Sequence, residues 1–134
     1  MDISEDLIRD IAGDLDLGEV VYLHKETLEK LTYPDTEDPE FDYLSVEVHE
    51  VVDADPDSYF CFEPPASHES FRFMEEFAGA QATDSMRAKL LKSLQAKRPF
   101  RSFRDAVERE GLVDRWYEFK DAQLCILVRD VLPE

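Results

Sequence analysis

The sequence predicts an α+β fold, in which an N-terminal helix and a small antiparallel sheet are followed by a C-terminal bundle of about four helices packed on the sheet. Apolar residues up to Glu63 fall mainly in short β-branched or alternating segments, whereas after Pro64 they recur at helical spacing. At 134 residues the chain is expected to form a single domain, 1–134, with an acidic helix-and-sheet part (1–63) and a helical part (64–134).

The first part begins with a helix and continues with strands. Ser4 precedes two acids and apolar residues at helical spacing, which predicts a short amphipathic helix closing between residues 13 and 18. The segment after the first strand favours another strand, entered through a turn near Thr27. Residues 34–42 combine prolines with acids and are predicted to form a solvated loop. Three segments are β-branched or alternate in polarity, which predicts strands at Glu19–His24 (the first strand), Tyr43–Val52 and Ser58–Glu63.

The second part is predicted to be helical throughout. Ser67 and Thr83 are candidate N-caps of the first two helices. The third helix should begin near Pro99 and stop at Gly111, because proline suits the first turn of a helix and glycine the position past its end. The last helix is predicted over residues 113–132, where its wide apolar arc indicates burial on more than one side.

The charges of the two parts differ sharply, although the chain as a whole carries a formal net charge of −17. Residues 1–63 contain 20 Asp or Glu and 3 Lys or Arg, while residues 64–134 contain 12 of each kind. Between Ser85 and Arg104 there is no acid. A segment of this kind can face an anionic macromolecule, either nucleic acid or an acidic protein. The predicted contact residues are Arg87, Lys89, Lys92, Lys97, Arg98, Arg101 and Arg104.

Aromatic residues accompany the bases in this region. At helical spacing such residues usually pack inside a protein. Arg101 and Arg104 should point to the adjoining flank of their helix, where Asp105 and Glu108 lie one turn further along. Phe100 and Phe103 are predicted to be core anchors, and Trp116 and Phe119 are likewise predicted to be packing residues.

Several segments occur in an order typical of one protein family. They are FMEEFAG (73–79), the Leu90–Leu94 helix, RPFRSFRDAVEREGLVDRWYEF (98–119) and VRDVL (128–132), and with them the chain resembles uncharacterised protein family 0158, small bacterial proteins of unknown function. The resemblance implies the fold and a bacterial cytosolic setting, and it implies no reaction. Those proteins usually have a Thr-Gly turn after the first strand, where this chain has Thr27-Leu28, and a small residue where it has Pro99.

The sequence does not predict an enzyme, and no catalytic residue, cofactor or metal is expected. The nucleotide-binding, hydrolase and zinc-protease motifs are absent. Cys61 and Cys125 lie 64 residues apart among apolar neighbours, which favours two reduced thiols. An enzyme in which His24 and His49 approach each other across the sheet is a minor alternative. An acidic N-terminus and the lack of a long apolar segment predict a cytoplasmic protein.

Two binding hypotheses remain from the charge pattern. The first is a binding or regulatory protein whose basic helical segment contacts an anionic partner, with nucleic acid as one such partner. The alternative is an acidic interaction protein or inhibitor that presents its acid-rich segment, 35–57, to a basic partner protein.

Overall fold

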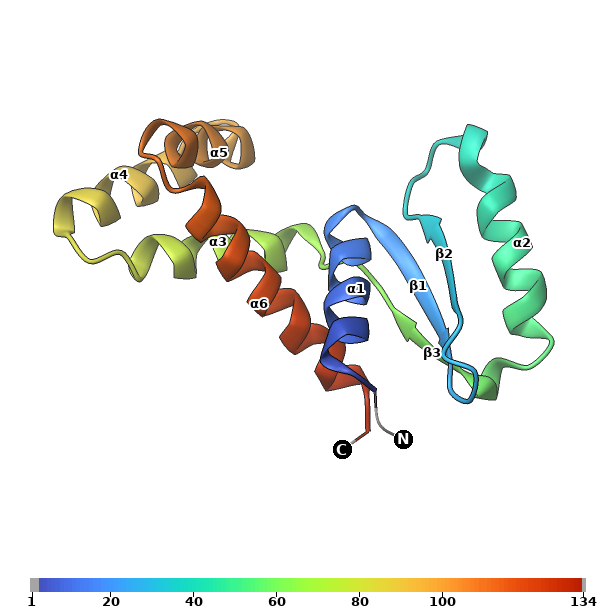
Figure 1. Ribbon diagram of the computed structural model, residues 1–134. Coiled ribbons are helices and arrows are strands. Elements are labelled where there is room, and N and C mark those ends of the chain that lie inside the picture. Colours follow the sequence, from blue (N-terminus) through green and yellow to red (C-terminus); the bar gives the residue numbers. More distant parts are fainter. Residues whose placement is uncertain (1–2, 134) are drawn as a thin grey trace. The chain divides into compact units, whose positions relative to one another are not determined.

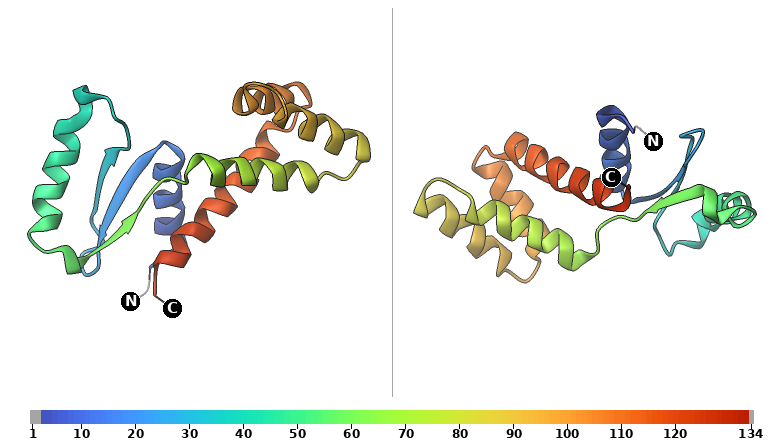
Figure 2. Two further views of the ribbon diagram at one scale, coloured as in Figure 1. Left: turned by 180° about the vertical axis from the view of Figure 1, so that it is seen from behind. Right: turned by 90° about the horizontal axis from the view of Figure 1, so that it is seen from below.

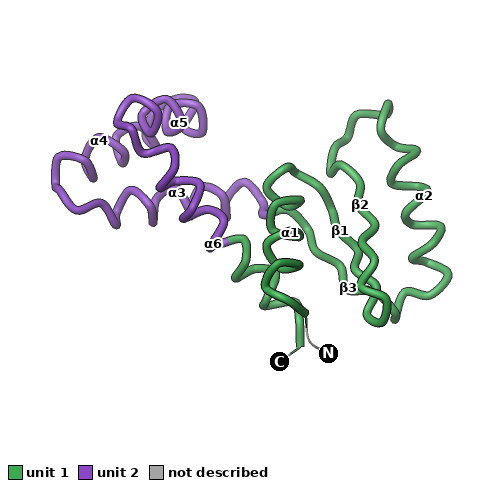
Figure 3. Tube along the Cα trace, in the orientation of Figure 1, with its two compact units in different colours: residues 1–64, 124–134 green, residues 65–123 purple. Residues whose placement is uncertain are grey.

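The computed structural model describes residues 3–133 and divides into two compact units (Figure 3). Unit 1 comprises residues 1–64 and 124–134, and unit 2 comprises residues 65–123. The predicted fold class is confirmed, since an N-terminal helix and a small antiparallel sheet precede the C-terminal helices among the described residues. No helix in the described part of the chain is long and apolar enough to span a membrane.

Unit 1 is built on a sheet in which β1 is the central strand. Its neighbours are β2 on one side and β3 on the other, and both pairings are antiparallel (Figure 1). Val21 lies opposite Thr32 and Phe62, and Tyr22 lies opposite Leu31 and Cys61. The elements of this unit that precede Pro64 are α1 (Glu5–Asp16), β1 (Glu19–His24), β2 (Lys30–Pro34), α2 (Asp42–Asp53) and β3 (Tyr59–Phe62), with 3₁₀ turns η1 (Pro39–Phe41) and η2 (Pro56–Ser58).

The two faces of the sheet carry different helices (Figures 1 and 2). The face that holds Val21 and Lys30 lies against α1, because the Lys30 ammonium reaches carboxylates of that helix. The opposite face holds Tyr22 and Tyr33, whose rings contact His49 of α2 edge-on, with centroids 6.0 and 5.3 Å from the imidazole. Successive side chains of a strand alternate between faces, so the sheet lies between α1 and α2.

The α1 contact contains a charged cluster at its edge. Lys30 Nζ lies 2.6 Å from Oδ2 of Asp10 and 2.6 Å from Oδ2 of Asp14, which are one turn apart on α1. Burial lowers the pKa of Lys30, but the hydrogen bonds to the two carboxylates outweigh this effect and raise the pKa above its usual value. The apolar stripe of the same helix is buried at Ile8, Ile11, Ala12 and Leu15.

The hairpin between β1 and β2 turns through Leu28 rather than through a glycine. Leu28 adopts a left-handed conformation with φ 61°, which costs a residue with a Cβ atom more than it costs glycine. The His24 ring helps to fix the turn, because its Nδ1 accepts hydrogen bonds from the N–H groups of Glu26 and Thr27, both at 3.1 Å. The strand predicted after a turn near Thr27 is thus β2.

The strand predicted at Tyr43–Val52 is wrong, because this segment is the helix α2. Val48 and Val52, one turn apart, are buried, whereas Val46 is 55% exposed although the alternation had placed it beside Val48. The preceding loop, predicted as solvated, is exposed from residue 35 to residue 38 and then enters η1. Asp38 caps that turn, since its Oδ1 accepts a hydrogen bond from the N–H of Glu40 at 3.0 Å. The other strands predicted from the sequence are present as β1 and β3.

Unit 2 consists of helices in its described residues. The predicted N-cap Thr83 is confirmed, since its Oγ1 accepts a hydrogen bond from the N–H of Met86 at 3.1 Å. Ser67, predicted as an N-cap, is instead the first residue of its helix, where Glu69 reaches back to the N–H of Ala66. The helices are α3 (Ser67–Gly79), α4 (Asp84–Leu94), α5 (Pro99–Arg109) and α6 (Val113–Val131), the last of which contributes its residues from Leu124 onward to unit 1.

Candidate anion-binding surface

The predicted basic segment forms the helical hairpin of α4 and α5. Pro99 is the first residue of α5, as predicted, because its fixed φ suits a first helical turn and its missing N–H leaves no donor unsatisfied. The hairpin ends at Gly111, which has φ +69° and allows the chain to turn toward α6. The basic residues therefore lie on two packed helices and the short turn between them, rather than on a flexible loop.

The apolar sides of α4 and α5 face inward, which leaves their basic side chains outside. Phe103 is 1% exposed, and its ring contacts the rings of Trp116 and Phe77 at centroid distances of 5.1 and 6.3 Å. The ring centroids of Phe119 and Phe77 lie 5.5 Å apart. The predictions for Phe103, Trp116 and Phe119 as packing residues are thereby confirmed. The buried cluster comprises Met74, Phe77, Ala78, Leu90, Leu94, Phe103, Ala106, Val107 and Leu112.

Phe100 does not belong to this buried cluster, so its prediction as a core anchor is wrong. Its side chain is 47% exposed, and it contacts the partly buried Phe71 edge-on with centroids 6.4 Å apart. The reason is its position in the first turn of α5, where only one neighbouring ring supports it. Phe100 thus presents aromatic surface to solvent among basic residues.

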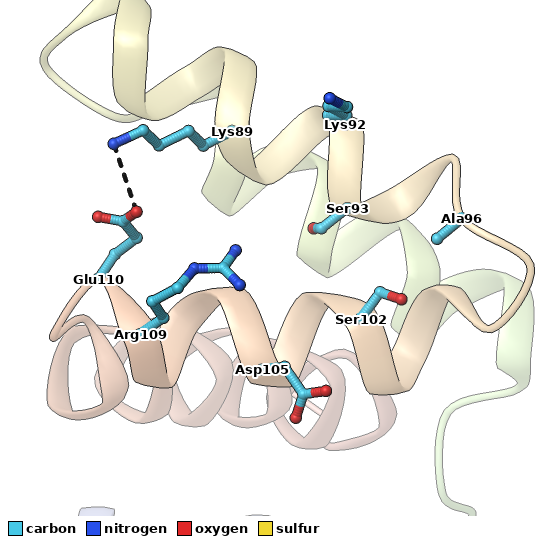
Figure 4. A pocket seen from close by; sticks show the side chains of 8 residues that line it. All are labelled: Lys89, Lys92, Ser93, Ala96, Ser102, Asp105, Arg109 and Glu110. Carbon is cyan, nitrogen blue, oxygen red and sulfur yellow. Dashed lines mark ion pairs between the residues drawn. The ribbon is translucent and has the colours of Figure 1, made fainter.

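A groove of about 520 Å³ lies between α4 and α5 (Figure 4). In Figure 4 Arg109 points from α5 toward α4, and Ser93 points from α4 toward α5. Three of the lining side chains are basic and two are acidic, so the groove carries only a small positive excess. The lining residues are Lys89, Lys92, Ser93, Ala96, Ser102, Asp105, Arg109 and Glu110.

Two of the predicted contact residues are engaged within unit 2. Arg87 forms an ion pair with Asp84 and donates a hydrogen bond from Nη1 to the carbonyl oxygen of Gln81 at 2.6 Å, so it ties the start of α4 to the preceding turn. Lys89 Nζ lies 3.4 Å from Oε1 of Glu110 across the groove (Figure 4). These contacts give Arg87 and Lys89 a structural role in the hairpin.

The other five predicted residues are exposed. Within the described residues of unit 2 none of them forms an ion pair, and the expected pairs of Arg101 with Asp105 and of Arg104 with Glu108 do not form. Lys92 lines the groove, while the remaining four are not among its lining residues and lie within four residues of Phe100 in the sequence. We call these four, Lys97, Arg98, Arg101 and Arg104, together with Phe100, the α5 flank.

Sequence reasoning missed the groove itself. Arg109, Ser93 and Ser102 line it, and none was predicted as a contact residue. Their spacing was a usable signal, since the lining residues of α4 follow i, i+3, i+4, with Ala96 just past its end at i+7, and those of α5 follow i, i+3, i+7. Two such stripes, on helices joined by a turn of a few residues, can line one groove of a helical hairpin, as they do here.

The histidines of the minor enzyme hypothesis do not meet across the sheet. His49 belongs to α2, where its Nε2 lies 3.2 Å from the Tyr33 hydroxyl, and His24 is held in the hairpin turn. Cys61 hydrogen-bonds Tyr22, and burial raises the pKa of both groups. A raised pKa keeps the Cys61 thiol protonated, which makes it a poor nucleophile.

No group of three or more His, Cys, Asp or Glu side chains in the described ranges is placed to hold a metal ion. Cys61 and Cys125, both among the described residues, do not form a disulfide.

The sequence matches one family model, described as uncharacterised protein family UPF0158, over residues 3–134. The protein belongs to UPF0158. The match extends beyond the segments that first indicated the resemblance, so it covers α1, the sheet and α2 of this UPF0158 protein as well as its helical part. Neither the curated proteins nor the solved structures include one that matches it.

Proposed function

We propose that this UPF0158 protein is a non-enzymatic binding or regulatory protein whose α5 flank contacts the phosphate backbone of a nucleic acid. The observation that carries the proposal is the state of the flank: four bases are exposed and lie outside any ion pair in the described part of unit 2. Arginine and lysine side chains in this state are available to phosphates, and the guanidinium groups can bind them through two parallel hydrogen bonds.

Charge distribution supports the same surface. Unit 2 contains eleven Lys or Arg and ten Asp or Glu, so it is nearly neutral as a whole. Between residues 85 and 104, by contrast, there are seven bases and no acid. A local excess of this kind attracts polyanions even in a protein with a net charge of −17, because screening limits the effect of charges farther than about 10 Å at 0.1 M salt.

The exposed Phe100 favours a single-stranded nucleic acid over an acidic protein. Aromatic side chains beside lysines and arginines are the usual stacking platform for unpaired nucleotides, and each stacked nucleobase contributes about 1–3 kcal/mol. Phe100 and Arg104 are one turn apart on α5, so a base on the ring leaves its phosphate close to the arginine. An acidic protein surface would make use of the arginines but not of the ring.

The test is fluorescence anisotropy with labelled single-stranded RNA, single-stranded DNA and duplex DNA over a range of salt concentrations. The variant Arg98→Glu/Arg101→Glu/Arg104→Glu should weaken binding to single strands by at least about a hundredfold and reduce the salt dependence by about two counterions, at roughly 0.7 per phosphate contact. The control, Arg72→Glu/Arg115→Glu, reverses two exposed arginines of α3 and α6, of which Arg72 is ion-paired with Glu76, and should change affinity little.

Phe100→Ala separates stacking from charge. It should weaken binding to single strands about fivefold or more and leave duplex binding unchanged. Absence of nucleic-acid binding at low salt, or equal binding by the triple variant and the natural protein, refutes the proposal. If the natural protein captures acidic proteins but no nucleic acid, and the triple variant captures neither, the partner of the α5 flank is an acidic protein.

A further inference from the structure

The helix α2 has an outer side that no part of unit 1 covers. Its inner residues are buried or half-buried, whereas apolar residues on the outer side remain largely exposed: Tyr43 59%, Val46 55% and Val51 50%. Glu47 and Glu50 are exposed among them. We call these five residues the α2 face. Large apolar side chains gathered on one side of a helix usually mark a contact surface rather than a solvated one.

The surroundings of the α2 face are acidic to an unusual degree. From residue 31 to residue 71 the chain has no Lys or Arg and twelve Asp or Glu. The ion pairs of the described residues do not involve the acids of residues 35–57. These carboxylates do not converge on a metal site within the described chain. Their charge is therefore spread along the helix and its entry loop.

We infer that the α2 face docks a basic amphipathic helix of a partner protein. Such a helix presents apolar residues at i, i+3, i+4 and i+7, which can pack between Tyr43, Val46 and Val51, and its flanking lysines or arginines then lie near Glu47 and Glu50. Charge complementarity selects a basic helix as the occupant. The α2 face lies in a segment that has carboxylates and no Lys or Arg, and only a basic helix would supply cations to pair with those carboxylates.

The helical state of residues 42–53 is what creates this surface. As a strand, the segment would place Val46 and Val48 on the same side, and no apolar stripe would remain on the other. As a helix it turns Val48 and Val52 inward and leaves Val46 and Val51 outside. The inference is independent of the nucleic-acid proposal, since the α5 flank belongs to unit 2 and the α2 face to unit 1.

The probes are two labelled helical peptides of about 18 residues, one of Leu and Lys in an amphipathic pattern and one of Leu and Glu in the same pattern. The Leu/Lys peptide should bind the full-length protein and weaken as salt rises, and the Leu/Glu peptide should not bind. Chemical-shift changes in an NMR titration should concentrate in residues 41–53.

Paired variants test the two components of the α2 face. Val46→Ser/Val51→Ser and Glu47→Gln/Glu50→Gln should each weaken binding of the Leu/Lys peptide by about tenfold, with unchanged circular dichroism and unchanged nucleic-acid binding. The controls, Ile126→Ser/Val131→Ser and Glu26→Gln/Glu29→Gln, remove β-branched apolar side chains and carboxylates from exposed positions elsewhere in unit 1 and should change affinity less than about twofold.

Three results overturn the inference. The first is equal binding of the two peptides, and the second is equal binding of the Leu/Lys peptide by natural protein and face variants. The third is a dimer in sedimentation equilibrium that the face variants dissociate, because the occupant would then be a second copy of the chain.

Discussion

Replacing Lys30 by methionine should destabilise the protein by about 2 kcal/mol. The variant keeps the apolar stem of the side chain and removes only the ammonium that bridges Asp10 and Asp14. Asp14 is 19% exposed, so its charge-assisted hydrogen bond is expected to contribute about 1.5 kcal/mol, whereas Asp10 is 58% exposed and its bond should contribute nearer 0.3 kcal/mol. The repulsion between the two carboxylates, one turn apart, is present in both proteins and therefore does not add to this difference.

The assay is urea unfolding followed by far-UV circular dichroism, with the change in midpoint converted to free energy through the common slope. A loss of about 2 kcal/mol corresponds to a fall in Tm of about 8 °C for a chain of this size. Asp14→Asn should be destabilising in the natural protein and neutral or stabilising beside Lys30→Met, because it then removes an uncompensated charge.

The pH dependence provides an independent check on the same residue. The pKa of Lys30 is raised in the folded protein, so the stability that it contributes is fully present below the ordinary lysine value of 10.5 and is lost as the pH rises through the folded pKa. The difference between natural protein and Lys30→Met should therefore shrink above pH 10.5. A loss below about 0.5 kcal/mol at pH 7, or an Asp14→Asn effect that is equal in both backgrounds, refutes the reasoning.

The other predictions concern backbone conformation, and urea midpoints measure all of them. Leu28→Gly should stabilise the protein by about 0.5 kcal/mol, because relief of the left-handed strain exceeds the added entropy of the unfolded chain, while Glu29→Gly should destabilise it. Stability lost on Leu28→Gly would contradict this account. Gly111→Ala should cost about 1 kcal/mol through its positive φ alone, since no atom beyond the adjacent residues of the chain lies within 4 Å of the added methyl group. Gly13→Ala, on the exposed side of α1, should gain about 0.5 kcal/mol. Equal effects of the two alanine substitutions would show that φ does not control them.

Most helices were predictable because each begins and ends with residues that act locally. Thr83, Pro99 and Gly111 determine the bounds of α4 and α5 through a side-chain acceptor, a fixed φ and a positive φ. These effects need no tertiary context. The same holds for β1, since its β-branched and aromatic residues favour extended backbone whether or not the sheet is known.

The helix α2 was not predictable from polarity alone, because its apolar residues fit two periods at once. Leu44, Val46 and Val48 alternate as in a strand, while Leu44, Val48 and Val52 repeat every four residues as in a helix. The helix start signal lay just upstream, where Asp38 precedes a proline as an N-cap precedes the first turn. The helical repeat is the one that forms, because it buries Val48 and Val52 within unit 1.

For the candidate site, the sequence located the basic segment. It did not predict which of the basic residues form ion pairs within the protein and which remain exposed. Arg87 and Lys89 are held by Asp84 and Glu110, and the second of these acids comes from beyond the segment, through the packing of α4 on α5. Phe100 and Phe103 share helical spacing, yet only Phe103 is surrounded by other rings. Such differences depend on which neighbour fills the space beside a side chain, and spacing does not contain that information.

The absence of Lys and Arg from residues 31–71 also governs how the protein can be cut. Trypsin cleaves only after these two residue types, so a complete digest leaves α2, β3 and all of β2 except Lys30 in a single long fragment, 31–72. A protease specific for glutamate would instead cleave at Glu47 and Glu50, inside the α2 face. Protection of those two bonds by a bound helix would give a direct footprint of the occupant, and trypsin would miss it entirely.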